Sequence, residues 1–127
     1  MTLLSVRDLE ITYNTESGPV PAVRGVDLDV GRGEVLGLAG ESGCGKSTIG
    51  LGVLRLLPQG TETRGHVLLD GQDVLSMRHR ELRMARWTQA SIVFQGAMHA
   101  LDPVIRVEDQ IAEAIMAHDL AGRRGAA

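Results

Sequence analysis

Apolar and polar residues alternate near the start of the chain and predict a pair of β-strands. The alternation runs through residues 3–12 and again through Val26–Val30, with the two-residue period of half-buried strands. Gly18-Pro19 and Gly31-Arg32-Gly33 are typical of turns, and they punctuate these two stretches. We therefore expect antiparallel strands in the first part of the chain.

A different pattern begins at Val35. Val35–Ala39 is a short continuous apolar run, which predicts a strand buried on both faces. A glycine-rich loop follows at once, and Lys46–Leu57 then places apolar residues on one side of a helix that Pro58 and Gly60 end. The sequence thus predicts a strand, a loop and a helix in succession.

Further elements complete an α/β pattern. We expect a second strand pair around Gly65–Gly71, a charged surface helix over Arg78–Arg86, an apolar strand over Ala90–Phe94 and a helix over Val107–Leu120. Because Asp70-Gly71 is a hairpin signal, Asp70 is interpreted as a turn residue and not as a metal ligand. No internal repeat or linker divides the chain into independent domains.

Composition excludes several classes of function. The formal net charge is −3, from 16 acidic and 13 basic residues scattered along the chain, so we expect no nucleic-acid partner. The single cysteine excludes an intrachain disulfide, no Cys/His cluster has zinc-ligand spacing, and both features fit a reducing compartment. No run approaches the ~18 apolar residues of a membrane span, so we expect no span in this chain. Among the basic residues only Lys46 is a lysine.

Lys46 belongs to the most specific motif in the chain. Gly40–Ser47 matches G-x-x-x-x-G-K-S, with a predicted strand before it and a predicted helix after it. Glycines let the backbone wrap around phosphate oxygens, successive N–H groups form an anion nest, and the helix presents its positive N-terminal end. We expect Lys46 to reach the β and γ phosphates and Ser47 to ligate Mg²⁺. The predicted nucleotide-binding residues of this segment are Gly40, Ser42, Gly43, Cys44, Gly45, Lys46, Ser47 and Thr48.

Other readings of the glycines and of the cysteine are less favourable. A guanine-specific GTPase is expected to carry an N-K-x-D motif, and Lys46, as the only lysine, does not belong to one. Gly31-Arg32-Gly33 and Gly50-Leu51-Gly52 lack the third glycine of a dinucleotide-binding fingerprint. Cys44 is interpreted as a small loop residue and not as a nucleophile, because no histidine or general base stands beside it in sequence.

Three landmarks in order resemble those of ABC transporter ATPases, namely Tyr13, Gly33–Ser47 and Ile92–Gln95. Phe94–Val104 resembles the F-Q-x-x-M-x-x-L-N-P-V segment of oligopeptide and dipeptide importer ATPases, with Asp102 in place of the usual asparagine. The resemblance implies an α/β fold, a P-loop NTPase core with an antiparallel β subdomain, incomplete at the C-terminus. It implies one partial ABC ATPase domain over residues 1–127: antiparallel strands and P-loop core in 1–95, and the Q-loop with the start of the helical subdomain in 95–127.

The resemblance also assigns roles outside the loop. Tyr13 would stack on adenine, which suits an aromatic face, although a strand tyrosine packed at the domain edge is the alternative. Gln95 would be the Q-loop glutamine that contacts Mg²⁺ and the attacking water, and a plain strand-end glutamine is the alternative. The implied cofactors are ATP and Mg²⁺. The implied partners are transmembrane permease subunits and a second ABC ATPase subunit, at a cytoplasmic location peripheral on the inner face of the cell membrane.

The motifs of the second half of such a domain are not found in the sequence. Residues 1–127 contain no L-S-G-G-Q signature, no Walker B aspartate with its catalytic glutamate, no D-loop and no switch histidine. The histidines are interpreted as solvated side chains; they are His66, His79, His99 and His118. We therefore expect no catalytic residue in this chain. Because the Walker B strand ordinarily lies beside the P-loop strand, Val35–Ala39 is expected to have an unpaired apolar edge.

The function expected from this resemblance is that of the ATP-binding component of an ABC transporter, which couples ATP binding and hydrolysis to the import of peptides or similar solutes. Two alternatives remain open. One is a non-catalytic nucleotide-binding or interaction fragment, and the other is an ABC-type ATPase with a non-transport role. The importer-like segment after Gln95 is the only feature that weighs against the second alternative.

Overall fold

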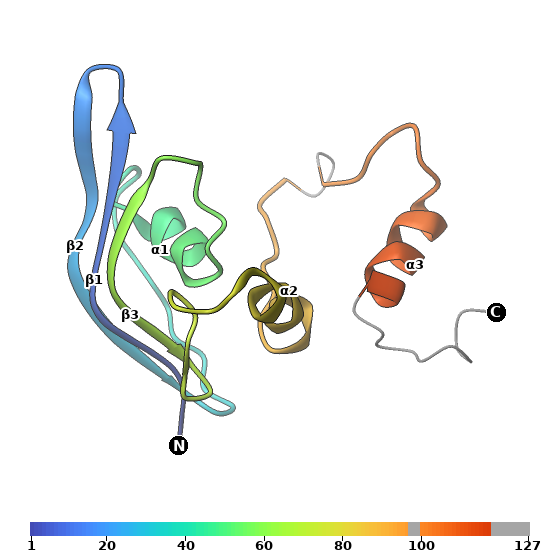
Figure 1. The fold of residues 1–127 in the computed structure, drawn as a ribbon, viewed down its shortest axis with the longest axis horizontal. Helices are drawn as coiled ribbons and strands as arrows, with labels where there is room; N and C mark the ends of the chain where they lie inside the picture. The colour runs from blue at the N-terminus through green and yellow to red at the C-terminus, as the bar shows by residue number, and fades with distance from the viewer. Residues whose placement is uncertain (97–99, 118–127) are drawn as a thin grey trace. The chain divides into compact units, whose positions relative to one another are not determined.

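A computed structural model describes residues 1–96 and 100–117, which fall into two compact units, Met1–Leu82 and a second that begins at Arg83. The first contains the strands β1 (Thr2–Thr15), β2 (Gly18–Gly31), β3 (Glu62–Leu69) and β4 (Gln72–Asp73) and the helix α1 (Lys46–Val53). The strands pair antiparallel in the order β2-β1-β3-β4, and α1 lies on one face of this sheet (Figure 1).

The predicted antiparallel strands are confirmed and extend further than their sequence pattern. β1 and β2 are joined through Glu16-Ser17, so Gly18-Pro19, which we expected as a turn, begins β2 instead. Asp70-Gly71 connects β3 to β4 with left-handed φ angles of 48° and 81°, as a type I′ turn requires. Asp70 is therefore a turn residue, as predicted, and its carboxylate accepts a hydrogen bond from Arg32 at 2.5 Å.

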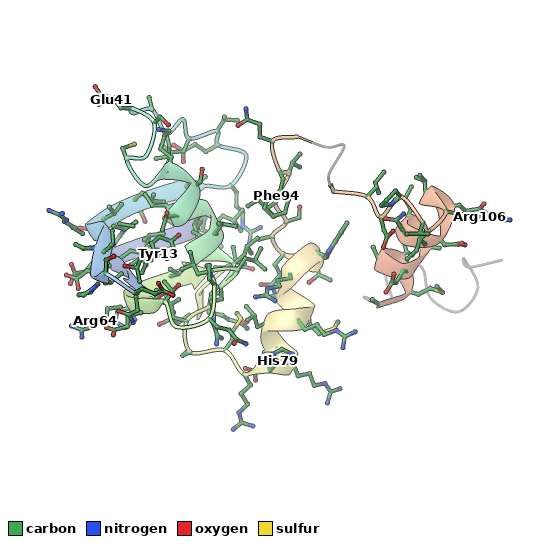
Figure 2. The ribbon with its side chains drawn as sticks, turned by 90° about the horizontal axis from the view of Figure 1, so that it is seen from above. Tyr13, Glu41, Arg64, His79, Phe94 and Arg106 are labelled. Carbon is green, nitrogen blue, oxygen red and sulfur yellow. The ribbon has the colours of Figure 1, made fainter. Side chains whose placement is uncertain are left out.

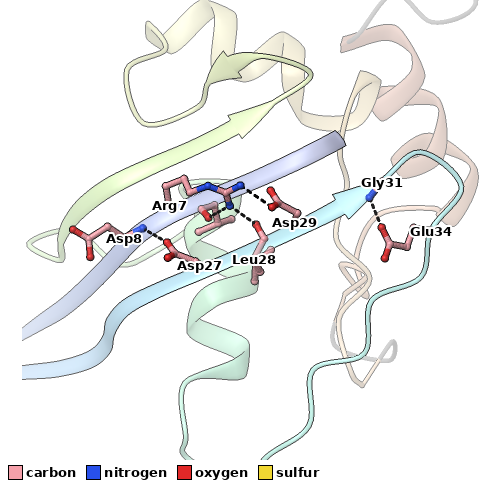
Figure 3. Close-up of polar contacts among 8 residues, drawn as sticks. Arg7, Asp8, Asp27, Leu28, Asp29, Gly31 and Glu34 are labelled. Carbon is pink, nitrogen blue, oxygen red and sulfur yellow. Dashed lines mark hydrogen bonds and ion pairs between the residues drawn. The ribbon is translucent and has the colours of Figure 1, made fainter. Parts of the chain in front are cut away.

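A bulge at Asp8 determines which side chains of β1 face the core. Asp8 has a φ of 47°, and the pairing of β1 with both of its neighbours shifts at this point. Strict alternation from Val6 would place Leu9 and Ile11 on the opposite face, yet all three side chains are fully buried. The Asp8 N–H donates to Asp27 Oδ1 at 2.6 Å (Figure 3), which ties the bulge to β2.

The core of the first unit lies between the sheet and α1. Gly52 of α1 approaches β1 so closely that a Cβ there would lie 2.7 Å from Ile11 Cδ1. The buried apolar side chains are those of Val6, Leu9, Ile11, Val23, Leu54, Val67, Leu69, Val74, Met77 and Leu82. α1 ends before the predicted Leu57 because Arg55 takes a left-handed φ of 51°.

Polar contacts on the β1–β2 hairpin fix the end of β2. Arg7 Nη2 donates to Asp29 Oδ2 at 2.6 Å, and this bond raises the pKa of Arg7. The same bond, together with one from Ser5, holds the pKa of Asp29 below its usual value. Glu34 Oε2 accepts the Gly31 N–H at 2.5 Å where β2 ends (Figure 3), so the chain leaves the sheet in a defined direction.

The two apolar strands predicted outside the antiparallel sheet are wrong. Val35–Ala39 takes part in no strand pairing, and Val35 is 96% exposed. Ala90–Phe94 has only an isolated bridge from Ala90, and Val93 is 95% exposed. A strand requires a hydrogen-bonded neighbour, and no strand of the described residues lies alongside either run. Of the strand, loop and helix expected in succession, the structure has the loop and the helix without the strand.

The remaining described chain contains two helices, both predicted. α2 (His79–Thr88) begins in the first unit, and its helical backbone ends at Ala85 because Arg86 and Trp87 leave the helical region. α3 (Val107–Ala117) belongs to the second unit, and the predicted helix residues 118–120 lie outside the described residues. Within the described ranges, no helix is both long and apolar enough to cross a membrane.

Candidate functional site

The glycine loop, Gly40–Ser47, leads directly into α1. Gly43 and Gly45 have left-handed φ angles of 81° and 99°, which bend the backbone back on itself. Gly45 is the N-cap of α1, and no side chain caps the first turn of the helix. A glycine N-cap leaves the first N–H groups of a helix available to an external acceptor.

Lys46 lies within the curve of the glycine loop. Its Nζ donates to the carbonyl oxygens of Gly40 and Glu41, both at 2.7 Å, and to Cys44 Sγ at 3.2 Å. In the described part of the chain no carboxylate forms an ion pair with Lys46. The charge of this lysine is therefore held by neutral oxygens of the loop, which phosphate oxygens are able to replace.

The Cys44 thiol lies beside the Lys46 ammonium group. The hydrogen bond from Lys46 lowers the pKa of the Cys44 thiol, and partial desolvation opposes this effect without reversing it. The side chain is exposed. It also lies close to the start of the loop, because a Cβ added at Gly40 would meet Cys44 Sγ at 2.6 Å. The thiol and the lysine thus line the same part of the loop.

The β1–β2 hairpin contacts the glycine loop and α1 at two points. A Cβ at Gly45 would lie 2.7 Å from the carbonyl oxygen of Ala22 on β2, so only glycine fits there without a shift of the backbone. The Tyr13 hydroxyl on β1 and Thr48 Oγ1 in the first turn of α1 are 3.1 Å apart and share a hydrogen bond. The hairpin therefore holds both the end of the loop and the start of the helix.

These contacts enclose a pocket of about 490 Å³. Its lining consists of Tyr13, Val20, Pro21 and Ala22 from the hairpin and of Ser42–Thr48 from the loop and helix. Figure 2 shows Tyr13 among the strands and Glu41 at the outer tip of the loop, directed away from the sheet. The pocket thus combines a lysine and the backbone N–H groups of the loop with aromatic and aliphatic side chains of the hairpin.

Most of the site residues predicted from the sequence come together in this pocket. Tyr13 and the predicted residues from Ser42 to Thr48 line it, and Gly40 contributes the carbonyl that Lys46 contacts. The sequence did not suggest Val20, Pro21 and Ala22. A hairpin turn placed at Glu16-Ser17 would have indicated them, because it pairs Tyr13 with Val20 and so brings this segment beside the tyrosine.

Gln95 belongs to the second unit and has an exposed side chain, so its assignment as a Q-loop glutamine stays a prediction.

The loop before α3 is closed by hydrogen bonds. Asp102 Oδ1 accepts the Val104 N–H at 2.8 Å, while Gln110 bonds the backbone of Asp102 through both ends of its amide and donates to the Ile105 carbonyl.

The Asp102 geometry explains why aspartate is suitable where the importer-like segment usually has asparagine. The bond to Val104 uses one side-chain oxygen as an acceptor, and an asparagine carbonyl provides the same acceptor. Residues 97–99 of this segment, including His99, lie outside the described residues, as does His118. Of the remaining histidines, His66 contacts Asp73 at 2.8 Å with its side chain 69% exposed.

Comparison with known proteins points to one family. The sequence pattern of the ABC transporter family matches residues 23–125. The chain is 45% identical over 116 residues to an oligopeptide transport ATP-binding protein of Mycobacterium tuberculosis, covering 91% of this chain and 19% of that protein. It is 42% identical over 123 residues to a probable peptide ABC transporter ATP-binding protein of Sinorhizobium fredii, covering 95% and 37%.

A dipeptide transport ATP-binding protein of Bacillus subtilis is 37% identical over 126 residues, which cover 98% of this chain and 38% of that protein. The chain therefore spans between 19% and 38% of the length of these three relatives.

Proposed function

Because this chain belongs to the ABC transporter family, we propose that its first unit binds ATP with Mg²⁺ in the pocket between the β1–β2 hairpin and the glycine loop. The observation that carries the proposal is the pairing, in one pocket of about 490 Å³, of Lys46 with the aromatic ring of Tyr13. Ligand pockets of small molecules and cofactors have volumes of about 300 to 1,000 Å³. A nucleotide offers phosphates to a cation and a planar base to an aromatic ring.

The proposed phosphate subsite offers hydrogen-bond donors and a positive charge. Among its described contacts Lys46 bonds only loop atoms. A triphosphate is therefore able to pair with the positive charge of Lys46 without breaking an existing ion pair. The N–H groups of the glycine loop and of the first turn of α1 supply further donors. Ser42, Gly43, Gly45, Ser47 and Thr48 are proposed as the surrounding phosphate contacts.

The donor set also fits Mg²⁺. Ser47 is exposed in the first turn of α1, where its hydroxyl oxygen suits a cation that takes most of its other ligands from phosphates and water. When bound, the ion neutralises the charge that develops between the β and γ phosphates. For Gln95, a role as a magnesium contact is proposed from the importer-like sequence segment Phe94–Val104 alone.

The proposed base subsite is the apolar side of the pocket that the hairpin forms. Tyr13 offers a ring, and Val20, Pro21 and Ala22 offer aliphatic surface, which together suit the planar face of adenine. The lining on this side contains no charged side chain to read the edge of the base. Stacking and apolar contact are therefore proposed as the source of base affinity.

At the level of the cell, we propose that the chain is the nucleotide-binding part of an ABC importer of peptides or similar solutes. Support comes from the relatives, whose names specify oligopeptide, peptide and dipeptide transport, and from the importer-like segment Phe94–Val104. The proposed partners are transmembrane permease subunits and a second ABC ATPase subunit, on the cytoplasmic face of the cell membrane. Hydrolysis is proposed to need the signature and Walker B groups, which residues 1–127 do not contain.

Equilibrium binding of MgATP to the purified chain, measured by calorimetry, tests the proposal. Lys46→Ala is expected to weaken binding at least tenfold, because it removes the charge that faces the phosphates. The matched control is Arg64→Ala, which removes a cation from β3 whose side chain is 75% exposed, and it is expected to bind as the wild type does. Equal affinity of the wild-type and Lys46→Ala chains would contradict the proposal.

A further inference from the structure

The Tyr13 ring is held at both ends. Its Cα is fixed by β1, which at this position pairs with Val20 of β2, and its hydroxyl bonds Thr48 Oγ1 at 3.1 Å. The two residues are 35 positions apart, and the hydrogen bond between them is part-buried. A tyrosine side chain has two main torsions, so fixing both the backbone and the hydroxyl leaves the ring little freedom to swing.

Thr48 lines the pocket from the first turn of α1. It follows Ser47 in the first turn of α1, beside the N-terminal end of the helix that faces the glycine loop. The bond to Tyr13 therefore connects the aromatic wall of the pocket to the element that holds the phosphates. A change in the position of α1 moves one end of the ring.

From this geometry we propose that the Tyr13 hydroxyl is a positioning group, which sets the base subsite at a fixed distance from the phosphate subsite through Thr48. The inference rests on the proposed function, since it concerns an adenine nucleotide bound in this pocket. A ring that is already oriented loses less side-chain entropy when the base binds. The contribution of the hydroxyl is thus to the joint binding of base and phosphates, and not to phosphate binding alone.

The test compares ATP with inorganic tripolyphosphate, which has the phosphates and lacks the base. Tyr13→Phe keeps the ring and removes the hydroxyl. It is expected to weaken ATP binding about fivefold, as the loss of one average hydrogen bond does. The same substitution is expected to weaken the binding of tripolyphosphate by a clearly smaller factor. Equal weakening of the two ligands would overturn the proposal, because the hydroxyl would then only support the helix.

A double-mutant cycle separates the coupling from each single effect. In a Thr48→Val chain, Tyr13→Phe is expected to change ATP affinity less than twofold, whereas in a Thr48→Ser chain, which keeps the hydroxyl, the fivefold effect returns. The same fivefold loss in the Thr48→Val chain would overturn the coupling. Because Tyr13 is the one tyrosine of the chain, selective tyrosine labelling gives a single set of ring resonances for NMR.

These resonances are expected to shift in Thr48→Val and to match the wild type in Thr48→Ser; unchanged resonances in both would count against a bond to Thr48. The outcomes also separate this inference from the proposed function. A wild-type chain that binds neither ATP nor tripolyphosphate would refute the proposed function. A wild-type chain that binds ATP, with Tyr13→Phe binding equally well, would refute only the role of the hydroxyl.

Discussion

Replacing Gly45 by alanine tests how the hairpin supports the glycine loop. Two costs combine at this position. An L-residue at a φ of 99° lies in a region that favours glycine, which costs roughly 1 to 2 kcal/mol. The new Cβ would also lie 2.7 Å from the Ala22 carbonyl oxygen, and a backbone atom moves less easily than a side-chain end. Overpacking of this kind costs about 1 to 3 kcal/mol.

Two other glycines serve as controls, Gly43 in the glycine loop and Gly50 in α1. Gly43 has a φ of 81° but open space around its Cβ position, so Gly43→Ala is expected to cost only the roughly 1 to 2 kcal/mol of the left-handed backbone. Gly50, within α1, has ordinary helical φ and open space, so Gly50→Ala is expected to stabilise the helix by up to about 1 kcal/mol.

Urea denaturation gives the free energy of unfolding of each chain, and calorimetry gives its affinity for MgATP. Gly45→Ala is expected to lose about 1 to 3 kcal/mol more than Gly43→Ala, or to relieve the collision by shifting the loop and thereby lose ATP affinity. If Gly45→Ala and Gly43→Ala lost the same stability and the same affinity, the contact between the loop and β2 would not matter.

Three further outcomes are expected. Alkylation of Cys44 at neutral pH, followed by mass spectrometry, is slowed by MgATP, and it is slower in Lys46→Ala because the hydrogen bond that lowers the thiol pKa is gone; equal rates with and without nucleotide would argue against a formed site. Burial raises the pKa of Asp73, but bonds from His66 and two backbone N–H groups outweigh it and lower the pKa below 3.8. The stability from Asp73 is therefore present above about pH 4 and lost as the pH falls through the lower folded pKa, a loss that Asp73→Asn should abolish in unfolding titrations. ATP hydrolysis by the purified chain stays at the level of Lys46→Ala, and robust turnover by the wild type would refute the need for further motifs.

The parts of the fold that depend on neighbouring residues were predictable from the sequence. The hairpin strands follow from local alternation, and the Asp70-Gly71 turn follows from the φ preferences of those two residues. The glycine loop was found for the same reason, since its spacing is contiguous from Gly40 to Ser47. Each of these features needs only a few consecutive residues.

Features that depend on distant partners were predicted poorly. Val35–Ala39 has the composition of a buried strand, but composition does not supply a strand to pair with, and Val35 remains exposed. The bond between Tyr13 and Thr48 joins residues 35 positions apart, so no local pattern indicates it. The bulge at Asp8 was missed because a single extra residue shifts the alternation without a proline or glycine to mark it.

A crystal structure of the chain with Mg²⁺ and a non-hydrolysable ATP analogue would show whether ATP binds between the β1–β2 hairpin and the glycine loop. We expect the phosphates to lie within Gly40–Ser47, Lys46 Nζ to exchange its present bonds to the Gly40 and Glu41 carbonyls for phosphate oxygens, and adenine to lie against Tyr13. A nucleotide bound elsewhere, with Lys46 still bonded to both carbonyls, would refute the proposed ATP site.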